Sequence, residues 1–201
     1  MEATVVRAPD GQATAITRLR WAWPVAIVVG FPIGGYAANL TVGEIDSVGA
    51  ALAGGLIAGS IAGAAQWLAL RAFVSWIWIA ATGVGMAAGL TAGAALVDYG
   101  IGRGDLMLMG AVTGLGVGGL QAFLLARRVS GAWWWAAVTP AAWALAWLVT
   151  SFVITKNVEE HFAVFGASGA LVFAVLTGLV LAVLLRRGER EATSARSQTG
   201  T

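Results

Sequence analysis

The hydrophobic positions of this chain form six long, uninterrupted stretches separated by short polar connections. The stretches cover about 21–40, 48–70, 74–97, 106–126, 132–154 and 163–185. A helix needs roughly 20 apolar residues to cross a bilayer, so each stretch is long enough to span. The stretches do not alternate apolar with polar residues, which favours helices over barrel strands. The pattern predicts an all-α polytopic membrane protein with a six-helix transmembrane domain over 21–185.

Two tails flank this domain. The N-terminal tail, 1–20, contains Glu2 and Asp10 before the first apolar stretch begins at Trp21. This order is atypical of a cleavable signal peptide, so we interpret the first stretch as a transmembrane helix. The C-terminal tail, 186–201, is rich in Ser, Thr and Arg, a composition that predicts a disordered segment.

Basic residues predict the orientation. If the N-terminus is cytoplasmic, ten of the twelve Lys and Arg residues fall on the cytoplasmic side, and only Arg103 and Lys156 fall outside. The ten are Arg7, Arg18, Arg20, Arg71, Arg127, Arg128, Arg186, Arg187, Arg190 and Arg196. The positive-inside rule therefore places both termini in the cytoplasm. Tryptophans cluster at the same helix ends, where we expect an interfacial anchor belt: Trp21, Trp23, Trp67, Trp76, Trp78, Trp133, Trp134 and Trp135.

An internal repeat links two of the stretches. Gly55, Gly59, Gly63 and Gln66 recur 55 residues later as Gly110, Gly114, Gly118 and Gln121. Glycines spaced by four lie on one helix face, where they allow another helix to approach closely. The alternative is that the same glycine face lines a pore.

The 55-residue period extends around the chain. Trp23, Trp78 and Trp133 follow it, and Gly59 and Gly114 continue to Gly169. Gly63 and Gln66 have no such counterparts in the last helix, which carries Phe173 and Leu176 instead. Two-helix repeats keep one direction, so they are related by an axis along the membrane normal. We therefore expect a pseudo-threefold bundle of three two-helix units.

The segment from Gly55 to Arg71, GLIAGSIAGAAQWLALR, followed by a Trp-rich helix start, resembles a loose group of uncharacterised bacterial multipass proteins. Their repeats show a glycine ladder that ends in Gln-Trp-x-x-Leu-Arg. The second copy departs from this pattern, with Ala122 and Phe123 in place of Trp67 and Leu68. The resemblance implies a repeat architecture and a bacterial plasma membrane location, and it implies no activity.

Composition narrows the chemistry. The chain has no cysteine, which excludes disulfides and thiolate sites. Asp, Glu, Lys, Arg and His are nearly absent from the six spans, whereas acid–base and nucleophilic catalysis need positioned titratable groups. We therefore predict no enzyme, no cofactor and no metal site. The net charge of +2 is explained by membrane orientation, so no nucleic-acid partner is expected.

Two sets of polar residues are candidates for a site. Gln66 and Gln121, with Thr177 as a shifted third member, either hydrogen-bond between helices or form a polar path at the cytoplasmic end. The outer connections are acidic and form either a solvated surface or a cation-attracting mouth: Glu44, Asp46, Asp98, Asp105, Glu159 and Glu160.

These features favour a non-catalytic integral membrane protein with a structural or accessory role. A small channel or facilitator, cation-preferring and running along the pseudo-threefold axis, is the alternative. The expected partners are the lipid bilayer, anionic headgroups at the cytoplasmic arginines, and a membrane-protein partner or second copy. A continuous axial cavity would favour the channel, and a dry, closely packed axis the structural role.

Overall fold

The computed structural model describes residues 9–127, 129–153 and 161–199, and this part of the chain is helical with no strands. Six helices follow one another: α1 (Pro9–Val42), α2 (Val48–Leu70), α3 (Ile77–Leu96), α4 (Arg103–Leu125), α5 (Trp133–Val153) and α7 (Ala167–Thr199). Each contains a segment of 20 or more residues that is apolar enough to cross a membrane. The predictions of an all-helical fold and of six spans are confirmed, and the chain is an integral multipass membrane protein by the length and composition of its helices.

The first and last helices extend beyond the apolar stretches. α1 begins at Pro9, inside the predicted N-terminal tail, and α7 continues to Thr199. The structure differs here from the expected disorder of 186–201. Adding residues to an existing helix avoids the cost of nucleation, and the Arg, Glu and Ala residues of this segment are good helix formers. The polar residues therefore mark the end of the apolar stretch but not the end of the helix.

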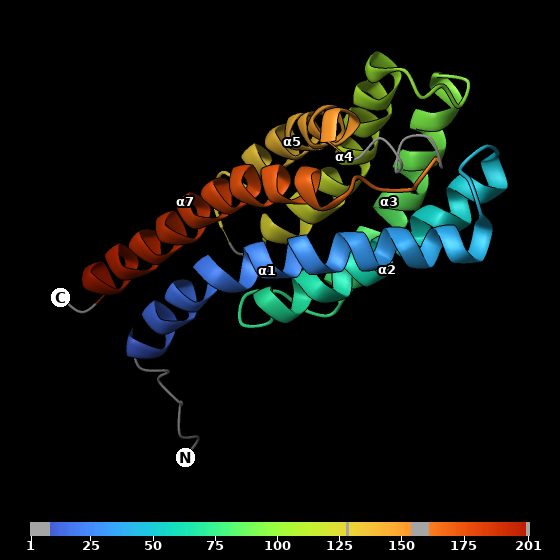
Figure 1. Ribbon diagram of the computed structural model, residues 1–201. Coiled ribbons are helices and arrows are strands. Elements are labelled where there is room, and N and C mark those ends of the chain that lie inside the picture. Colours follow the sequence, from blue (N-terminus) through green and yellow to red (C-terminus); the bar gives the residue numbers. More distant parts are fainter. Residues whose placement is uncertain (1–8, 128, 154–160, 200–201) are drawn as a thin grey trace.

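The six helices form a closed ring (Figure 1). Each helix packs against the helices before and after it, and α7 packs against α1. No other pair of helices in the described residues approaches backbone to backbone. The short connections make consecutive helices antiparallel, so the start of α1 and the end of α7 lie at the same end of the bundle.

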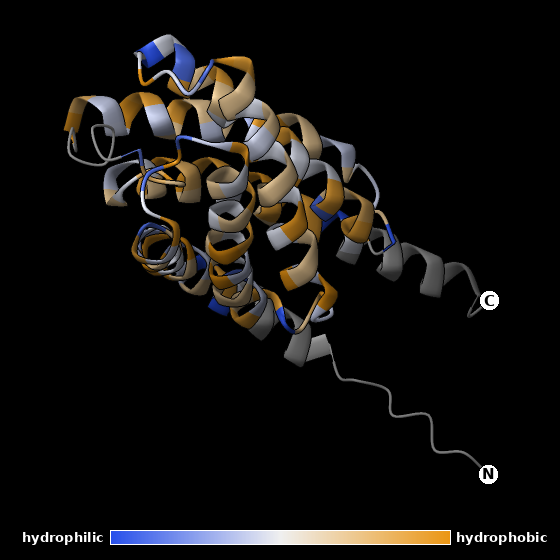
Figure 2. Ribbon diagram, turned by 90° about the vertical axis from the view of Figure 1, so that its right-hand side faces the viewer, coloured by the Kyte–Doolittle hydropathy of each residue, from blue (hydrophilic) through white to orange (hydrophobic). Residues whose placement is uncertain are grey.

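The ring presents many large aliphatic side chains outward, whereas small, aromatic and further aliphatic side chains face inward. On α1, Val25, Val29 and Ile33 are about half exposed or more, whereas Ile27 and Phe31 are completely buried. Figure 2 shows that most hydrophilic residues lie in the connections and near the helix ends. An apolar exterior with polar ends is the surface that a bilayer solvates.

Glycines close the contacts between neighbouring helices. A Cβ added at Gly55 or Gly59 would lie 2.8 Å from a backbone atom of α3, and Gly63 contacts Thr82 of the same helix. Gly114 and Gly118 likewise contact α5 at Thr139 and Pro140, and Gly110 contacts Trp143 and Trp147. A side chain would meet the Thr139 side chain at Gly118 and backbone at the other positions, so the absent Cβ allows the helices to approach closely.

The last helix departs from the 55-residue register. Gly59 and Gly114 face the helix that follows them, but Gly169 meets Ala146 and Thr150 of α5, the helix that precedes it. Thr113 is the residue of α4 that makes the comparable contact, with Gly89 of α3. The equivalence of Gly169 with Gly59 and Gly114 is therefore wrong by one position, because Ala146 lies 57 residues after Gly89 and Gly169 lies 56 after Thr113, so the period of 55 is not kept.

Candidate functional site

The tryptophans of the expected anchor belt form an exposed set and a buried set, and Trp67 is partly buried. Trp21, Trp76, Trp133 and Trp134 are 46–79% exposed near the helix ends, where an anchor belt would lie. Trp23, Trp78 and Trp135 are at most 1% exposed. The expectation that all of them anchor the interface is therefore wrong for these three, which point into the bundle.

Each of these three tryptophans donates a hydrogen bond to a polar side chain on a neighbouring helix. Trp78 Nε1 donates to Gln66 Oε1 at 2.9 Å, and Trp135 Nε1 donates to Gln121 Oε1 at 2.9 Å. The third pair joins α1 to α7, with Trp23 Nε1 donating to Thr177 Oγ1 at 3.1 Å. We call these six side chains the polar layer: Trp23, Gln66, Trp78, Gln121, Trp135 and Thr177. All six are buried.

The polar layer reaches across the inside of the ring. Gln121 Nε2 of α4 donates to Gln66 Oε1 of α2 at 2.9 Å and to Thr82 Oγ1 of α3 at 2.8 Å. The indole of Trp135 lies 5.7 Å from that of Trp23 and 6.3 Å from that of Trp78, measured between ring centroids. Since α2 and α4 are not neighbours in the ring, and neither α1 nor α3 is a neighbour of α5, these side chains meet in its centre.

A second group of aromatic rings fills the interior next to the polar layer. Phe31, Trp143, Phe165 and Phe173 lie with ring centroids 5.1–5.8 Å apart, in stacked, tilted and edge-on arrangements. All four are buried. Aromatic contacts of this kind stabilise a core beyond the area they bury. The interior is therefore occupied by side chains at two successive levels.

The residues of the predicted polar path therefore lie close together, but they are hydrogen-bonded to the surrounding helices. Gln66, Gln121 and Thr177 lie in one layer, and Thr177 Oγ1 also donates to the Phe173 carbonyl. Because these glutamines already form hydrogen bonds with tryptophans and with each other, they offer few free donors or acceptors to a passing solute. Their arrangement is that of a buried interhelical network.

The acidic residues of the outer connections serve separate local contacts. Asp105 Oδ2 accepts a bond from the Gly102 backbone N–H at 3.2 Å, at the start of α4. Glu44 Oε2 lies 3.4 Å from His161 Nδ1, which joins the first outer connection to the last. Asp46 and Asp98 are exposed, and Glu159 and Glu160 lie outside the described residues. No group of three metal-ligating side chains occurs in the described part.

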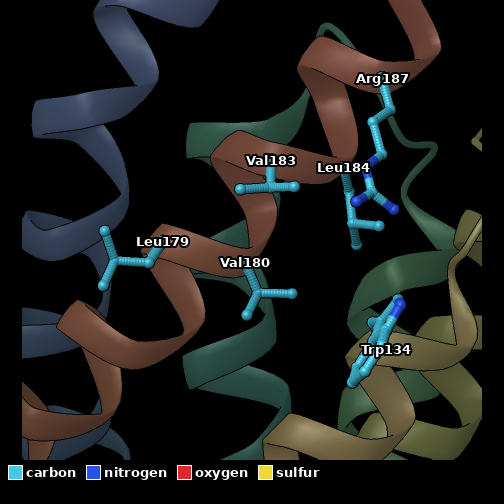
Figure 3. A pocket seen from close by; sticks show the side chains of 6 residues that line it. All are labelled: Trp134, Leu179, Val180, Val183, Leu184 and Arg187. Carbon is cyan, nitrogen blue, oxygen red and sulfur yellow. The ribbon is translucent and has the colours of Figure 1, made fainter.

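Hollows lie at the flanks and the outer end of the bundle. One of about 460 Å³ separates α1 from α7 and is lined by Arg20, Trp23 and Arg186. A second of about 270 Å³ lies between α5 and α7, where Arg187 and Trp134 face the same space (Figure 3). The third, about 10 Å³, lies beside Tyr99 and His161 and has room for about one water.

Comparison with protein-family models, with curated proteins and with solved structures finds no match to this chain. The tryptophan partners of the glutamines were not predicted. One signal was available, because Trp78-x-x-x-Thr82 recurs as Trp135-x-x-x-Thr139 and each threonine donates to the carbonyl of its tryptophan. That spacing selects Trp135, not Trp133, as the counterpart of Trp78.

Proposed function

We propose that this chain is a non-catalytic integral membrane protein with a structural or accessory role in a bacterial plasma membrane. The observation that carries the proposal is the polar layer, in which buried indoles and glutamines fill the place where a solute path would run. An enzyme is disfavoured because the described interior offers hydroxyl, amide and indole groups, and acid–base catalysis requires titratable ones.

The architecture we propose is three two-helix units around a pseudo-threefold axis: α2 with α3, α4 with α5, and α7 with α1. Each unit contributes one tryptophan bonded to one polar side chain of the polar layer. The third unit is the most divergent, because Thr177 stands where the others carry glutamine. A duplicated hairpin that closes on itself explains why the first and last helices pair.

We further propose that both termini are cytoplasmic. Within 17–188, the described charged residues at the end of the ring that holds the start of α1 are all arginines: Arg18, Arg20, Arg71, Arg127, Arg186 and Arg187. The opposite end carries Glu44, Asp46, Asp98, Asp105 and one arginine, Arg103. This asymmetry supports the orientation through the positive-inside rule.

Single cysteines will test the orientation in this cysteine-free chain. Ser75→Cys, in the exposed α2–α3 connection, should resist a membrane-impermeant maleimide in intact cells and react after lysis. Asp46→Cys, on the acidic end, should react in intact cells. The reverse labelling pattern would place the arginines outside and refute the proposed topology.

The channel alternative rests on the buried glutamines and makes a different prediction. We expect purified protein in liposomes to give no K⁺ or Na⁺ flux above empty vesicles, because rings and amides close the interior. A pore-forming peptide in the same vesicles is the positive control. Ion-selective flux that Gln66→Leu with Gln121→Leu abolishes, while the protein keeps its thermal stability, would establish the channel instead.

A further inference from the structure

The helices α1 and α7 pack less closely than the other neighbouring pairs of the ring, and a groove lies between them. Its floor is formed by Trp23, Pro24 and Gly178, and its exposed wall by Val175, Leu179 and Val183, which are 50–64% exposed. A Cβ at Gly178 would lie 3.2 Å from Trp23 Cδ1. The indole therefore stands between the two helices here, whereas glycines bring backbone to backbone elsewhere in the ring.

Two arginines line one end of this groove. Arg20 comes from α1 and Arg186 from α7, and both are exposed. Among residues 17–188 whose side chains the structure describes, neither guanidinium pairs with a carboxylate, and the ion pair there is that of Glu44 with His161. Guanidinium groups bind phosphate oxygens through paired N–H donors. The groove therefore has an anion-binding end and is apolar along the rest of its length.

The length of the groove matches one leaflet of a bilayer. Ala174 and Arg186 mark its two ends on α7, and twelve residues of helix rise about 18 Å. Half of a hydrocarbon core is about 15 Å thick. An acyl chain whose headgroup lies at the arginines would therefore extend along the groove to about the bilayer midplane.

We propose that the α1–α7 groove binds an anionic glycerophospholipid from the leaflet on the arginine side. Its phosphate lies between Arg20 and Arg186, and one acyl chain lies along Trp23, Gly178 and Val183. This goes beyond the proposed structural role and does not depend on the orientation. A second copy of the chain is a poorer occupant, because it would bring the same described arginines to the same end.

The neighbouring groove between α5 and α7 is an internal comparison. It is smaller, about 270 Å³, and carries a single guanidinium, Arg187, which faces the ring of Trp134 (Figure 3). Leu179 and Val183 contribute to both grooves. Only the α1–α7 groove places two arginines from different helices at one opening, so we assign the lipid to that groove.

Native mass spectrometry of the full-length protein in detergent, titrated with dioleoyl phosphatidylglycerol or phosphatidylcholine, tests the assignment. We expect Arg20→Gln with Arg186→Gln to weaken binding of the first phosphatidylglycerol by about thirtyfold, since each arginine near an anionic surface contributes about 1 kcal/mol. The control, Arg71→Gln with Arg127→Gln, removes the same charge at the same end and should change binding less than about twofold. Equal losses in both variants would mean diffuse attraction and overturn the site.

A second variant tests the acyl chain. Ala182→Phe places a ring in the groove and should weaken retention of phosphatidylglycerol while leaving the thermal stability unchanged. Free sn-glycerol 3-phosphate should not compete, because it lacks the chain. Competition by glycerol phosphate, unchanged lipid binding in Ala182→Phe, or a dimer that this variant dissociates without loss of lipid would each refute the proposal.

Discussion

Gly114→Leu is expected to disrupt the folded bundle. A Cβ at this position would lie 2.7 Å from Pro140 Cα and 2.9 Å from the Thr139 carbonyl oxygen, and backbone atoms cannot move aside as a flexible side chain can. Overpacking a core costs about 1–3 kcal/mol and occasionally more, and contact with backbone places this change at the upper end. We expect a lower unfolding temperature in detergent by circular dichroism and an early aggregate peak in size-exclusion chromatography. Gly59→Leu should behave similarly, and Gly→Ala should be milder at both positions.

Gly119→Leu is the matched control, because it lies on the same helix and a Cβ there meets nothing within 4 Å. Leucine forms helix more readily than glycine by up to about 1 kcal/mol, so this variant should be as stable as the parent or more so. If Gly114→Leu and Gly119→Leu unfolded at the same temperature, close packing at Gly114 would not be what holds α4 against α5.

Gln121→Leu is expected to have the second largest effect on stability. Gln121 joins three helices through its bonds to Trp135, Gln66 and Thr82. Interhelical hydrogen bonds in membranes contribute about 0.6 kcal/mol on average, and a buried donor left unpaired costs about 1–3 kcal/mol. Because the indole N–H of Trp135 loses its acceptor, we expect a total loss of about 2–3 kcal/mol in the free energy of unfolding.

A double-mutant cycle separates the hydrogen bond from the change in shape. Trp135→Phe removes the stranded donor, so Gln121→Leu should cost about 1 kcal/mol less in that background than in the parent. Two threonines of α3 give a matched comparison. Thr82→Val should destabilise, because its hydroxyl accepts from Gln121, whereas Thr91→Val should be nearly neutral, because the Thr91 hydroxyl has no partner in the described residues. If the effects of Gln121→Leu and Trp135→Phe on the free energy of unfolding were additive, the polar layer would have no energetic role.

The glycine pattern shows what sequence periodicity can predict and what it cannot. A spacing of four residues in an apolar run places Gly55, Gly59 and Gly63 on one helix face whatever they contact, because the helix period alone decides it. The helix that receives that face depends on the whole ring. Gly169 lies in an apolar helix as Gly114 does but meets the preceding helix. The period of 55 residues is not kept around the ring, and only the closed bundle reveals this shift.

The sequence by itself determined that the chain is helical, spans a membrane six times and carries its arginines at alternate helix ends, since length, apolarity and charge are local properties. Only the tertiary structure decided which tryptophans are interfacial and which are buried. Trp133 and Trp135 are two residues apart and chemically identical, yet they are 60% and 1% exposed. The indole N–H of Trp135 finds its acceptor, Gln121, on another helix. That pairing depends on how the helices close into a ring, which no single helix encodes.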